Sequence, residues 1–425
     1  MTPMTNLWTH SNTETAATQP LTADAVADLV IIGAGFTGCA AALEAARAGR
    51  KAVVLEAQTI AHGGSGRNVG LVNAGLWLKP DEVVAQMGEA AGSRLTEELG
   101  KGPAAVFSLI REYDMDCEAT PAGTLHLAHS QAGLADLQDR FRQGNRLGAP
   151  VQMLDRDETI RRTGSQAFHG ALLDPRAGTV QPRAYCTGLA RAAISLGASI
   201  HETSPVTRIR HVDGTWQVSS NGHTVTAPAL LVATNAYHQL ASGAYAPQYV
   251  TVNYCQFATA PMTDAQRDQV LPGGEGCWDT ALVMSSVRTD RAGRLIVGGM
   301  GQSDGPGGAI HAGWARRKLA KLYPELADLP FEHAWSGRIA MTSDHVPKAV
   351  EFGPSAYAVF GFSGRGICPG TVIGTAAAKA LTGAGADAMP MPVVRGYSER
   401  FTGPRSAYYE FGATLTHALN PGILG

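Results

Sequence analysis

The stretch DLVIIGAGFTGCAAALEAARAGRKAVVLE (residues 28–56) decides the fold of this chain. Residues 28–33 are an apolar run typical of a buried strand, and residues 51–56 form a second run of the same kind. Between them, residues 41–50 have the composition of a helix that ends at Gly49. A strand, a helix and a second strand in this order form one βαβ unit, which predicts a parallel sheet.

Three glycines after the first strand have the spacing of a dinucleotide-binding turn. Gly33 permits the tight turn, Gly35 lets backbone N–H groups reach a pyrophosphate, and Gly38 lets the helix pack closely on the sheet. The positive end of the helix dipole would then face the phosphates. Glu56 ends the second strand, where a carboxylate accepts hydrogen bonds from a ribose hydroxyl. The residues expected to contact the dinucleotide here are Gly33, Ala34, Gly35, Phe36, Thr37, Gly38, Glu56 and Ala57.

The turn alone does not separate NAD from FAD, but three later segments favour FAD. GGSGRNVGLVNAG (63–75) is a glycine-rich loop that can wrap a flavin diphosphate or ring edge. ALLVATNAY (229–237) is an apolar strand that ends in Ala-Thr-Asn, and GFSGRGICPG (361–370) precedes a helix. Backbone N–H groups and the helix dipole of this last segment could hold the electron-rich edge of a flavin. In the first loop the expected contacts are Ser65, Gly66, Arg67, Asn68, Val69, Gly70 and Leu71.

Composition limits the class of protein. The chain has 425 residues, more than the roughly 250–300 at which a single core stops growing, so about two domains are expected. The net charge of −2 gives no reason to expect a nucleic-acid partner. The six cysteines are scattered, without metal-ligand spacing, which predicts no metal site and favours reduced thiols in the cytoplasm. Neither a signal peptide nor an apolar run of about 18 residues is seen, so no membrane-spanning segment is expected.

Nucleotide-type elements occur at the start, middle and end of the chain, with antiparallel-looking strands between them. Residues 81–145 have mostly helical spacing, residues 250–300 contain several strands, and residues 395–419 are expected to be helical. The predicted fold class is α/β (α+β), with a Rossmann-like FAD-binding domain interleaved with an antiparallel-sheet substrate domain. The predicted division is 28–80, 150–240 and 333–385 for FAD binding, 81–149 and 241–332 for substrate binding, and 386–425 for a C-terminal helical tail.

The order of these motifs resembles the D-amino-acid oxidase superfamily of FAD-dependent oxidoreductases, nearest its sarcosine, glycine, pipecolate and γ-glutamylputrescine oxidase branches. The resemblance runs from about Asp28 to Leu381. It implies that Val206 contacts the adenine through its backbone and that Thr234 lies near the phosphates or ribose, and Asn235 beside it is expected to contact the cofactor. It also implies a flavin site bordered by Gly364, Arg365, Gly366 and Ile367 and lined by Gly337, Arg338 and Met341.

The chain departs from its relatives at positions that affect the cofactor. Some relatives attach FAD through a cysteine in the segment that matches 337–342, which holds none here, and Cys368 lies past the flavin loop. Noncovalent FAD is therefore expected, with a histidine link through His62 as the minor alternative. Relatives of the sarcosine oxidase type carry a lysine that speeds reaction with oxygen, and Ile296 stands at the matching position.

The resemblance implies hydride transfer from a carbon next to nitrogen to flavin N5, followed by hydrolysis of the imine and reoxidation by O2. A substrate carboxylate would need an arginine or tyrosine clamp. The candidates for this catalytic role are Tyr254, Arg338 and Arg365, although a buried arginine often pairs with a structural carboxylate instead. Trp335 is the best tryptophan candidate for the pocket wall, and Asp344 and His345 are expected in a surface turn rather than a polar relay.

Three functions stay open at this point. The leading hypothesis is an oxidase of a small amine or amino acid, secondary amino acids included. The second is a flavin dehydrogenase that passes electrons to a quinone or carrier protein instead of O2. The third is a non-catalytic flavoprotein, while an NAD-dependent dehydrogenase would leave the middle and late segments without a purpose.

Overall fold

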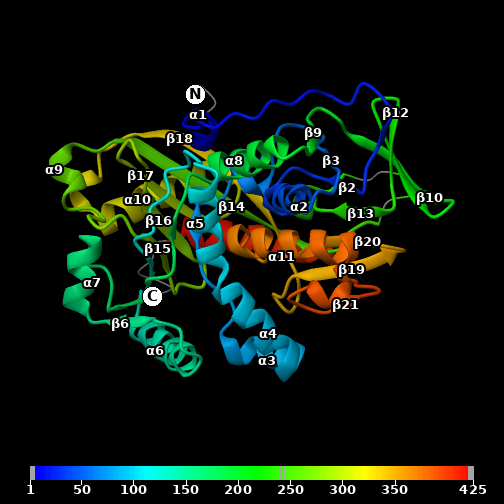
Figure 1. Cartoon of the computed structure of the whole chain (residues 1–425). Coiled ribbons are helices and arrows are strands. Elements are labelled where there is room, and N and C mark those ends of the chain that lie inside the picture. Colours follow the sequence, from blue (N-terminus) through cyan, green and yellow to red (C-terminus); the bar gives the residue numbers. More distant parts are fainter. Residues whose placement is uncertain (1–4, 240–241, 244, 420–425) are drawn as a thin grey trace.

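The computed structural model describes residues 5–239, 242–243 and 245–419 (Figure 1). A seven-stranded sheet has the order β21-β19-β20-β13-β2-β3-β9 and includes the predicted βαβ unit. The five strands from β20 to β9 are parallel, β19 runs antiparallel to β20, and β21 is parallel to β19. The strands are β2 (Leu29–Ile32), β3 (Ala52–Leu55), β9 (Ser199–His201), β13 (Ala229–Val232), β19 (Lys348–Gly353), β20 (Ala356–Phe360) and β21 (Val393–Val394). The predicted parallel sheet is confirmed, and it joins segments from the start, middle and end of the chain.

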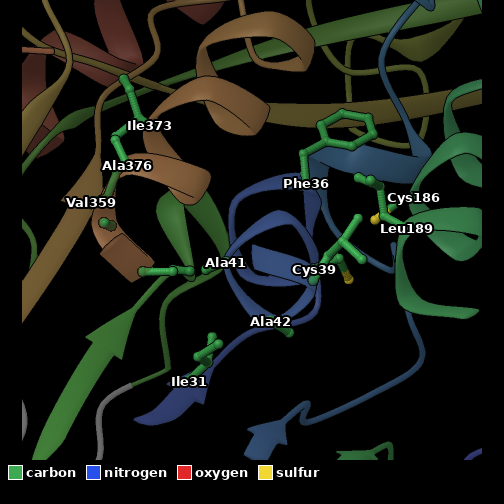
Figure 2. Close-up of a cluster of buried hydrophobic side chains, with 14 of the residues drawn as sticks. Ile31, Phe36, Cys39, Ala41, Ala42, Cys186, Leu189, Val359, Ile373 and Ala376 are labelled. Atoms are coloured by element: carbon green, nitrogen blue, oxygen red, sulfur yellow. The ribbon is translucent and has the colours of Figure 1, made fainter. Parts of the chain in front are cut away.

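Three helices pack together beside this sheet: α2 (Phe36–Arg47), α8 (Pro182–Ser195) and α11 (Ile367–Lys379). Figure 2 shows α2 end-on, with side chains of α11 on one side and of α8 on the other. The α2–α11 contact is close because small residues line it. A Cβ added at Gly374 would lie 2.3 Å from the carbonyl oxygen of Thr37, and one at Gly370 would lie 3.2 Å from Cβ of Phe36. The early and late glycine segments of the sequence are thereby held against each other.

The helices α2 and α11 begin earlier in the chain than the sequence predicts. α2 begins at Phe36, so Gly38 lies inside its first turn, and Gly49 ends it with a φ of +70°. α11 begins at Ile367, so the last four residues of the predicted loop 361–370 are helical. Pro369 is compatible with this because a proline in the first helical turn removes only an N–H that has no partner within the helix.

A second sheet of eight strands has the order β18-β14-β17-β16-β15-β5-β7-β6. Its pairs are antiparallel except β15 with β5, which confirms the predicted antiparallel sheet apart from that pair. The helix α10 (Gly308–Leu322) covers it and buries Leu319 with Leu295 and Val297. The strands are β5 (Thr124–Leu127), β6 (Gln152–Leu154), β7 (Ala171–Asp174), β14 (Val250–Pro261), β15 (Gly276–Asp279), β16 (Ser285–Thr289), β17 (Arg294–Met300) and β18 (Phe331–Met341).

The remaining elements are small. A four-stranded sheet contains β1 (Ala25–Val26), β10 (Val206–Val212), β11 (Thr215–Ser220) and β12 (His223–Ala227), and β4 (Leu71–Val72) pairs with β8 (Gly178–Thr179). The helical prediction for 81–145 is confirmed, as is a helix within 395–419. The other α-helices are α1 (Leu7–His10), α3 (Pro80–Met87), α4 (Glu89–Gly100), α5 (Gly102–Glu112), α6 (Gln131–Arg146), α7 (Arg156–Thr163), α9 (Asp264–Arg267) and α12 (Thr402–Ala418).

The two-domain division remains a proposal. Strand membership bears on its boundaries, because β6 and β7 lie within 150–240 yet pair in the eight-stranded sheet, and β21 lies beyond 385 yet joins the seven-stranded one. Within the described residues, no helix has the length and apolar character needed to cross a membrane. The same part of the chain holds no cluster of three or more metal-ligating side chains.

Candidate active site

A cavity of about 1000 Å³ lies between the two large sheets. Its wall includes the turns after β2, β3 and β13 on one side and the strands β14, β16 and β18 on the other. Open α/β sheets bind ligands at the carboxyl ends of their strands, and this volume is at the upper end of that found for ligand pockets. The cavity therefore has the place and the size for a bound dinucleotide with a substrate.

The glycine turn forms one end of the cavity. Gly33 has a φ of +103°, and a Cβ added at Gly38 would lie 1.9 Å from the carbonyl oxygen of Gly33. No side chain caps α2 at Gly35, although the N–H of Phe36 donates to Oγ of Ser65 at 3.0 Å. An uncapped helix N-terminus that faces a cavity suits a pyrophosphate.

Glu56 stands beside this turn. Its carboxylate accepts the N–H of Ala34 at 2.8 Å and the N–H of Gln58 at 2.9 Å. Burial raises the pKa of Glu56 above its usual value of 4.5, and the backbone hydrogen bonds counteract part of that effect. A carboxylate held at the carboxyl end of β3 is the group that a ribose hydroxyl would contact.

The late glycine loop forms the neighbouring wall. Gly364 has a φ of +94°, and a Cβ added at Gly366 would meet no atom within 4 Å. Gly366 precedes α11, whose N-terminus has no side-chain cap. The uncapped N-termini of α2 and α11 thus face one cavity. Backbone N–H groups at these termini suit the acceptor atoms of a diphosphate and a flavin.

The loop after β3 is held by hydrogen bonds rather than left flexible. The amide nitrogen of Asn68 donates to the carbonyl oxygens of Gly64 and Ser65. Two indole N–H groups donate hydrogen bonds to this loop. That of Trp8 donates to the carbonyl oxygen of Asn68 at 2.8 Å, and that of Trp335 donates to the carbonyl oxygen of Arg67 at 3.0 Å. These bonds fix the backbone of a segment that lines the cavity.

The register of the eight-stranded sheet places polar side chains in one row that faces the cavity. Trp278 stands opposite Ser286, Ser286 opposite Gly298, and Gly298 opposite Gln256. A Cβ at Gly298 would lie 2.4 Å from Oε1 of Gln256 and 2.7 Å from Oγ of Ser286. Gly298 therefore leaves the space that the polar side chains on either side of it occupy.

Tyr254 and Gln256 extend from β14 on the same side of the strand. The hydroxyl of Tyr254 donates to Oγ of Ser286 at 3.0 Å, and burial raises the pKa of this phenol, which keeps it neutral. Gln256 is fully buried, and neither atom of its amide has a hydrogen-bond partner among the described residues. The indole nitrogen of Trp278 also lacks one. Buried polar groups are rarely left unpaired, so these groups indicate a ligand in the cavity.

Arg365 reaches the same row from the late loop. Its guanidinium lies over the ring of Trp278, 5.0 Å from the centroid, and donates to the carbonyl of Ala74 at 2.9 Å. Burial lowers the pKa of Arg365 to about 10, which leaves the group charged at neutral pH. Within the described residues Arg365 makes no ion pair, and the carboxylate of Asp174, whose charge acts on Arg365 from a distance, pairs with Arg176.

Arg338 occupies a different place from Arg365. Arg338 lies in β18 and pairs with Asn253 of β14. Its neighbour Gly337 pairs with Tyr254. The exposed guanidinium of Arg338 lies 4.3 Å from the ring centroid of Tyr237, on the rim of the cavity. The sequence analysis treated Arg338 and Arg365 as equivalent candidates for a clamp. Because side chains alternate along a strand, Arg338 extends from the side of β18 opposite to that of Gly337, the partner of Tyr254.

The other predicted contacts divide into two groups. Gly38, Gly66 and Gly70 lie outside the lining, because backbone carbonyl groups occupy the space next to them. Of the cofactor residues named from the sequence, those that line the cavity are Gly33, Ala34, Gly35, Phe36, Thr37, Glu56, Ala57, Ser65, Arg67, Asn68, Val69, Leu71, Val206, Thr234, Asn235, Gly337, Met341, Gly364, Arg365, Gly366 and Ile367.

Some secondary expectations lie elsewhere in the structure. Trp335 and Ile296 pack with Leu7 and Trp8 in a buried cluster outside the cavity lining, whereas Trp278 lines the cavity. The turn expected at Asp344 and His345 is present, and the ring of His345 lies at the cavity wall, 5.4 Å from that of Trp77.

Sequence reasoning missed Gln256 and Ser286, and it predicted the helix α12 without its place at the cavity. A polar residue at the centre of an apolar strand, as Gln256 is in VTVNYCQFATA, was the one available signal.

Residues 28–380 match the family described as FAD dependent oxidoreductase. The chain is 29% identical over 343 residues to a probable oxidoreductase OrdL of Rhizobium meliloti, covering 80% of this chain and 79% of that protein. It is 27% identical over 402 residues to gamma-glutamylputrescine oxidoreductase of Escherichia coli, covering 90% and 92%. The structure of glycine oxidase from Geobacillus kaustophilus superposes with a TM-score of 0.72 at 20% identity, covering 88% of this chain and all of that one.

Proposed function

Because this chain belongs to the family of FAD-dependent oxidoreductases, we propose that it uses its FAD to oxidise the C–N bond of a small amino acid. When bound, FAD supplies the acceptor for a hydride from the carbon next to nitrogen, and the resulting imine hydrolyses in water. The relatives named gamma-glutamylputrescine oxidoreductase and glycine oxidase support an amine or amino acid as substrate.

Arg365 is the observation that carries the amino-acid part of this proposal. A half-buried guanidinium that makes no ion pair loses part of its hydration, and a ligand of opposite charge would compensate for that loss. Its plane matches a carboxylate, which it would bind through two parallel hydrogen bonds. A substrate carboxylate at Arg365 would lie beside Trp278, in the row that continues to Ser286 and Gln256.

The neighbouring polar groups would orient the substrate nitrogen. The amide of Gln256 offers both a donor and an acceptor, and Tyr254 with Ser286 forms a neutral hydrogen-bonded pair beside it. The cavity side of this row is poor in carboxylates, which disfavours an ammonium and favours the neutral amine that hydride transfer requires. We assign these three residues to orientation and to the exclusion of water.

The residues that would hold FAD are those of the two glycine segments. The turn at Gly33–Gly38 and Glu56 would bind the diphosphate and ribose, and the loop at Gly364–Ile367 would border the flavin. The thiol of Cys368 packs against Gly102 of α5, which supports noncovalent attachment. Acid precipitation of the protein should therefore release all of the flavin into solution.

The electron acceptor has two candidates. Reoxidation by O2 is the first, and transfer to a quinone or carrier protein is the second. One observation favours the second: among the described residues no lysine lines the cavity. The six cysteines are buried free thiols, which supports a cytoplasmic location for either activity.

The test is anaerobic mixing of the purified FAD-loaded protein with single amino acids and amines, with flavin absorbance as the readout. Bleaching by a carboxylated amine, and not by the matching amine without the carboxylate, is the expected result. Admission of air then separates the acceptors, because fast recovery with peroxide release identifies an oxidase. A flavin that no compound bleaches would contradict the proposal and leave a non-catalytic flavoprotein.

A further inference from the structure

We propose that the substrate carries an uncharged, apolar tail that lies between α12 and the loop of residues 280–284. This inference rests on the proposed function, because it assumes that the amino acid is held at Arg365. It adds the class of side chain or N-substituent that the enzyme selects. It rests on the orientation of α12, the apolar loop that lines the same cavity, and the distribution of charge along that cavity.

The helix α12 is docked through its polar side. Oγ of Ser406 accepts the N–H of Thr251 at 2.9 Å, and the carboxylate of Glu410 accepts the amide N–H of Asn253 at 2.9 Å. His417 is fully buried, and its ring stacks on Trp314 with 4.0 Å between centroids. Ser406, Glu410 and His417 are spaced by four and seven residues, so they share one face of the helix.

The apolar stripe of α12 consists of Tyr408, Phe411 and Leu415, and it faces outward. These residues are 72%, 68% and 47% exposed, and their spacing of three and four residues places them on one face. A surface helix normally turns its apolar face to the core and its polar face to water. The reverse arrangement here indicates that something apolar covers the stripe when the protein works.

The loop of residues 280–284 presents a second apolar group to the same space. Leu282 is 98% exposed, and Val283 and Met284 follow it. All three line the same cavity as the stripe, and so does Trp77, which is 42% exposed. The occupant is identified by continuity, because this one cavity also contains Arg365 and Tyr254. A substrate bound there shares one continuous cavity with the loop and α12, so its tail can reach the space that they line.

Charge limits what the tail can be. Glu56 is the only acidic residue among the described residues that line the cavity, and it lies beside the glycine turn rather than at α12. A second ammonium on the tail would therefore lose its hydration without gaining a counter-ion. An alkyl or aryl tail would instead remove apolar side chains from water.

Norleucine, 2-aminobutanoate and lysine test the inference directly, each in both enantiomers and as the N-methyl derivative. Norleucine has two more methylene groups than 2-aminobutanoate, and lysine adds an ammonium to a tail of the same length as norleucine. The readout is the second-order rate constant of anaerobic flavin reduction. We expect norleucine to exceed 2-aminobutanoate by about tenfold, from the burial of two methylene groups, and to exceed lysine by at least as much.

The double variant Phe411→Ala/Leu415→Ala tests whether the stripe causes this preference. We expect the ratio of rate constants for norleucine over 2-aminobutanoate to fall towards one. The matched control is Leu147→Ala, because Leu147 is 55% exposed at the end of α6 and lies outside the cavity lining. This control should keep the wild-type ratio.

The failures of the two proposals are distinguishable. If neither these compounds nor any other amino acid or amine of the anaerobic screen bleaches the flavin, the proposed function fails. If only amino acids without an apolar tail bleach it, the function stands and the apolar tail is refuted. If 2-aminobutanoate bleaches it as efficiently as norleucine, or lysine as efficiently as norleucine, the function stands and the apolar tail is refuted. A double variant that loses dimerisation or vesicle binding while it keeps the wild-type ratio would assign the stripe to a second copy or a lipid surface, and would also overturn the inference.

Discussion

The guanidinium of Arg365 lies 5.0 Å from the ring centroid of Trp278, although 87 residues of sequence separate the two. Trp278 belongs to β15 of the eight-stranded sheet, and Arg365 belongs to the loop between β20 of the seven-stranded sheet and α11. This contact therefore joins the parts of the molecule built on the two large sheets. The indole face stabilises a cation that has no acidic partner among the described residues. The contact thus keeps a charged, unpaired guanidinium at the cavity wall.

The first prediction concerns this arginine. Arg365→Met should raise the KM for a carboxylated substrate by about 10- to 100-fold, because a charge-assisted bond contributes about 1.5–3 kcal/mol. The matched control is Arg338→Met, since that guanidinium lies over Tyr237 on the rim. Steady-state kinetics of both variants with one amino acid measure the difference. Equal losses in the two variants would contradict the assignment of Arg365 as the clamp.

The second prediction concerns the space at Gly298. The variant Gly298→Ala should lower kcat/KM by tenfold or more, because its Cβ would lie 2.4 Å from Oε1 of Gln256 and 2.7 Å from Cε1 of Tyr254. The bound flavin should be retained, since Gly298 is not in either glycine segment. Kinetics and the ratio of flavin to protein absorbance measure the two effects. Gly403→Ala is the control, because a Cβ there meets no atom within 4 Å.

The third prediction concerns the affinity for FAD. Glu56→Ala should weaken FAD binding by about 10- to 100-fold, the loss expected for a hydrogen bond to a charged group. Glu56→Gln should give a smaller loss, because the amide keeps one oxygen as an acceptor. Titration of the flavin-free protein with FAD, followed by fluorescence quenching, gives the dissociation constants. Glu44→Ala is the control, as Glu44 pairs with Lys379 on α11.

The fourth prediction concerns stability in acid. Burial, then the charges of His311, Arg317 and Lys318, lower the pKa of His417 to about 3. The unfolded chain has a histidine pKa near 6.5, so between these two values it binds a proton that the folded state does not. Stability should therefore be complete above pH 6.5 and fall as the pH decreases, by about 2 kcal/mol from this group at pH 5.

Urea unfolding at pH 7.5 and pH 5.0 measures this effect. The variant His417→Gln should be less stable than the wild type at pH 7.5, because it loses the stacking on Trp314. It should also lose less stability between the two pH values. An unchanged difference would mean that other buried histidines, such as His126, account for the acid sensitivity.

The amino-acid sequence by itself determined the nucleotide-binding sheet and both glycine segments. A buried strand, a glycine turn and a helix are encoded by neighbouring residues, since backbone conformation and hydrophobic periodicity are local properties. Gly33 and Gly364, with φ values of +103° and +94°, adopt conformations that other residues rarely do, so the sequence marks these turns directly.

Only the tertiary structure decided how the substrate side is built. Gln256, Ser286 and Gly298 meet because three strands pair in one register, and a shift of one residue would turn each side chain to the other face. Alternation along β18 likewise places Arg338 and Gly337 on opposite sides of that strand. The outward apolar face of α12 also depends on pairing with distant residues, since Glu410 docks on Asn253 across 157 positions. Contacts of this kind are absent from any local window of sequence, which is why the fold was predictable and the substrate side was not.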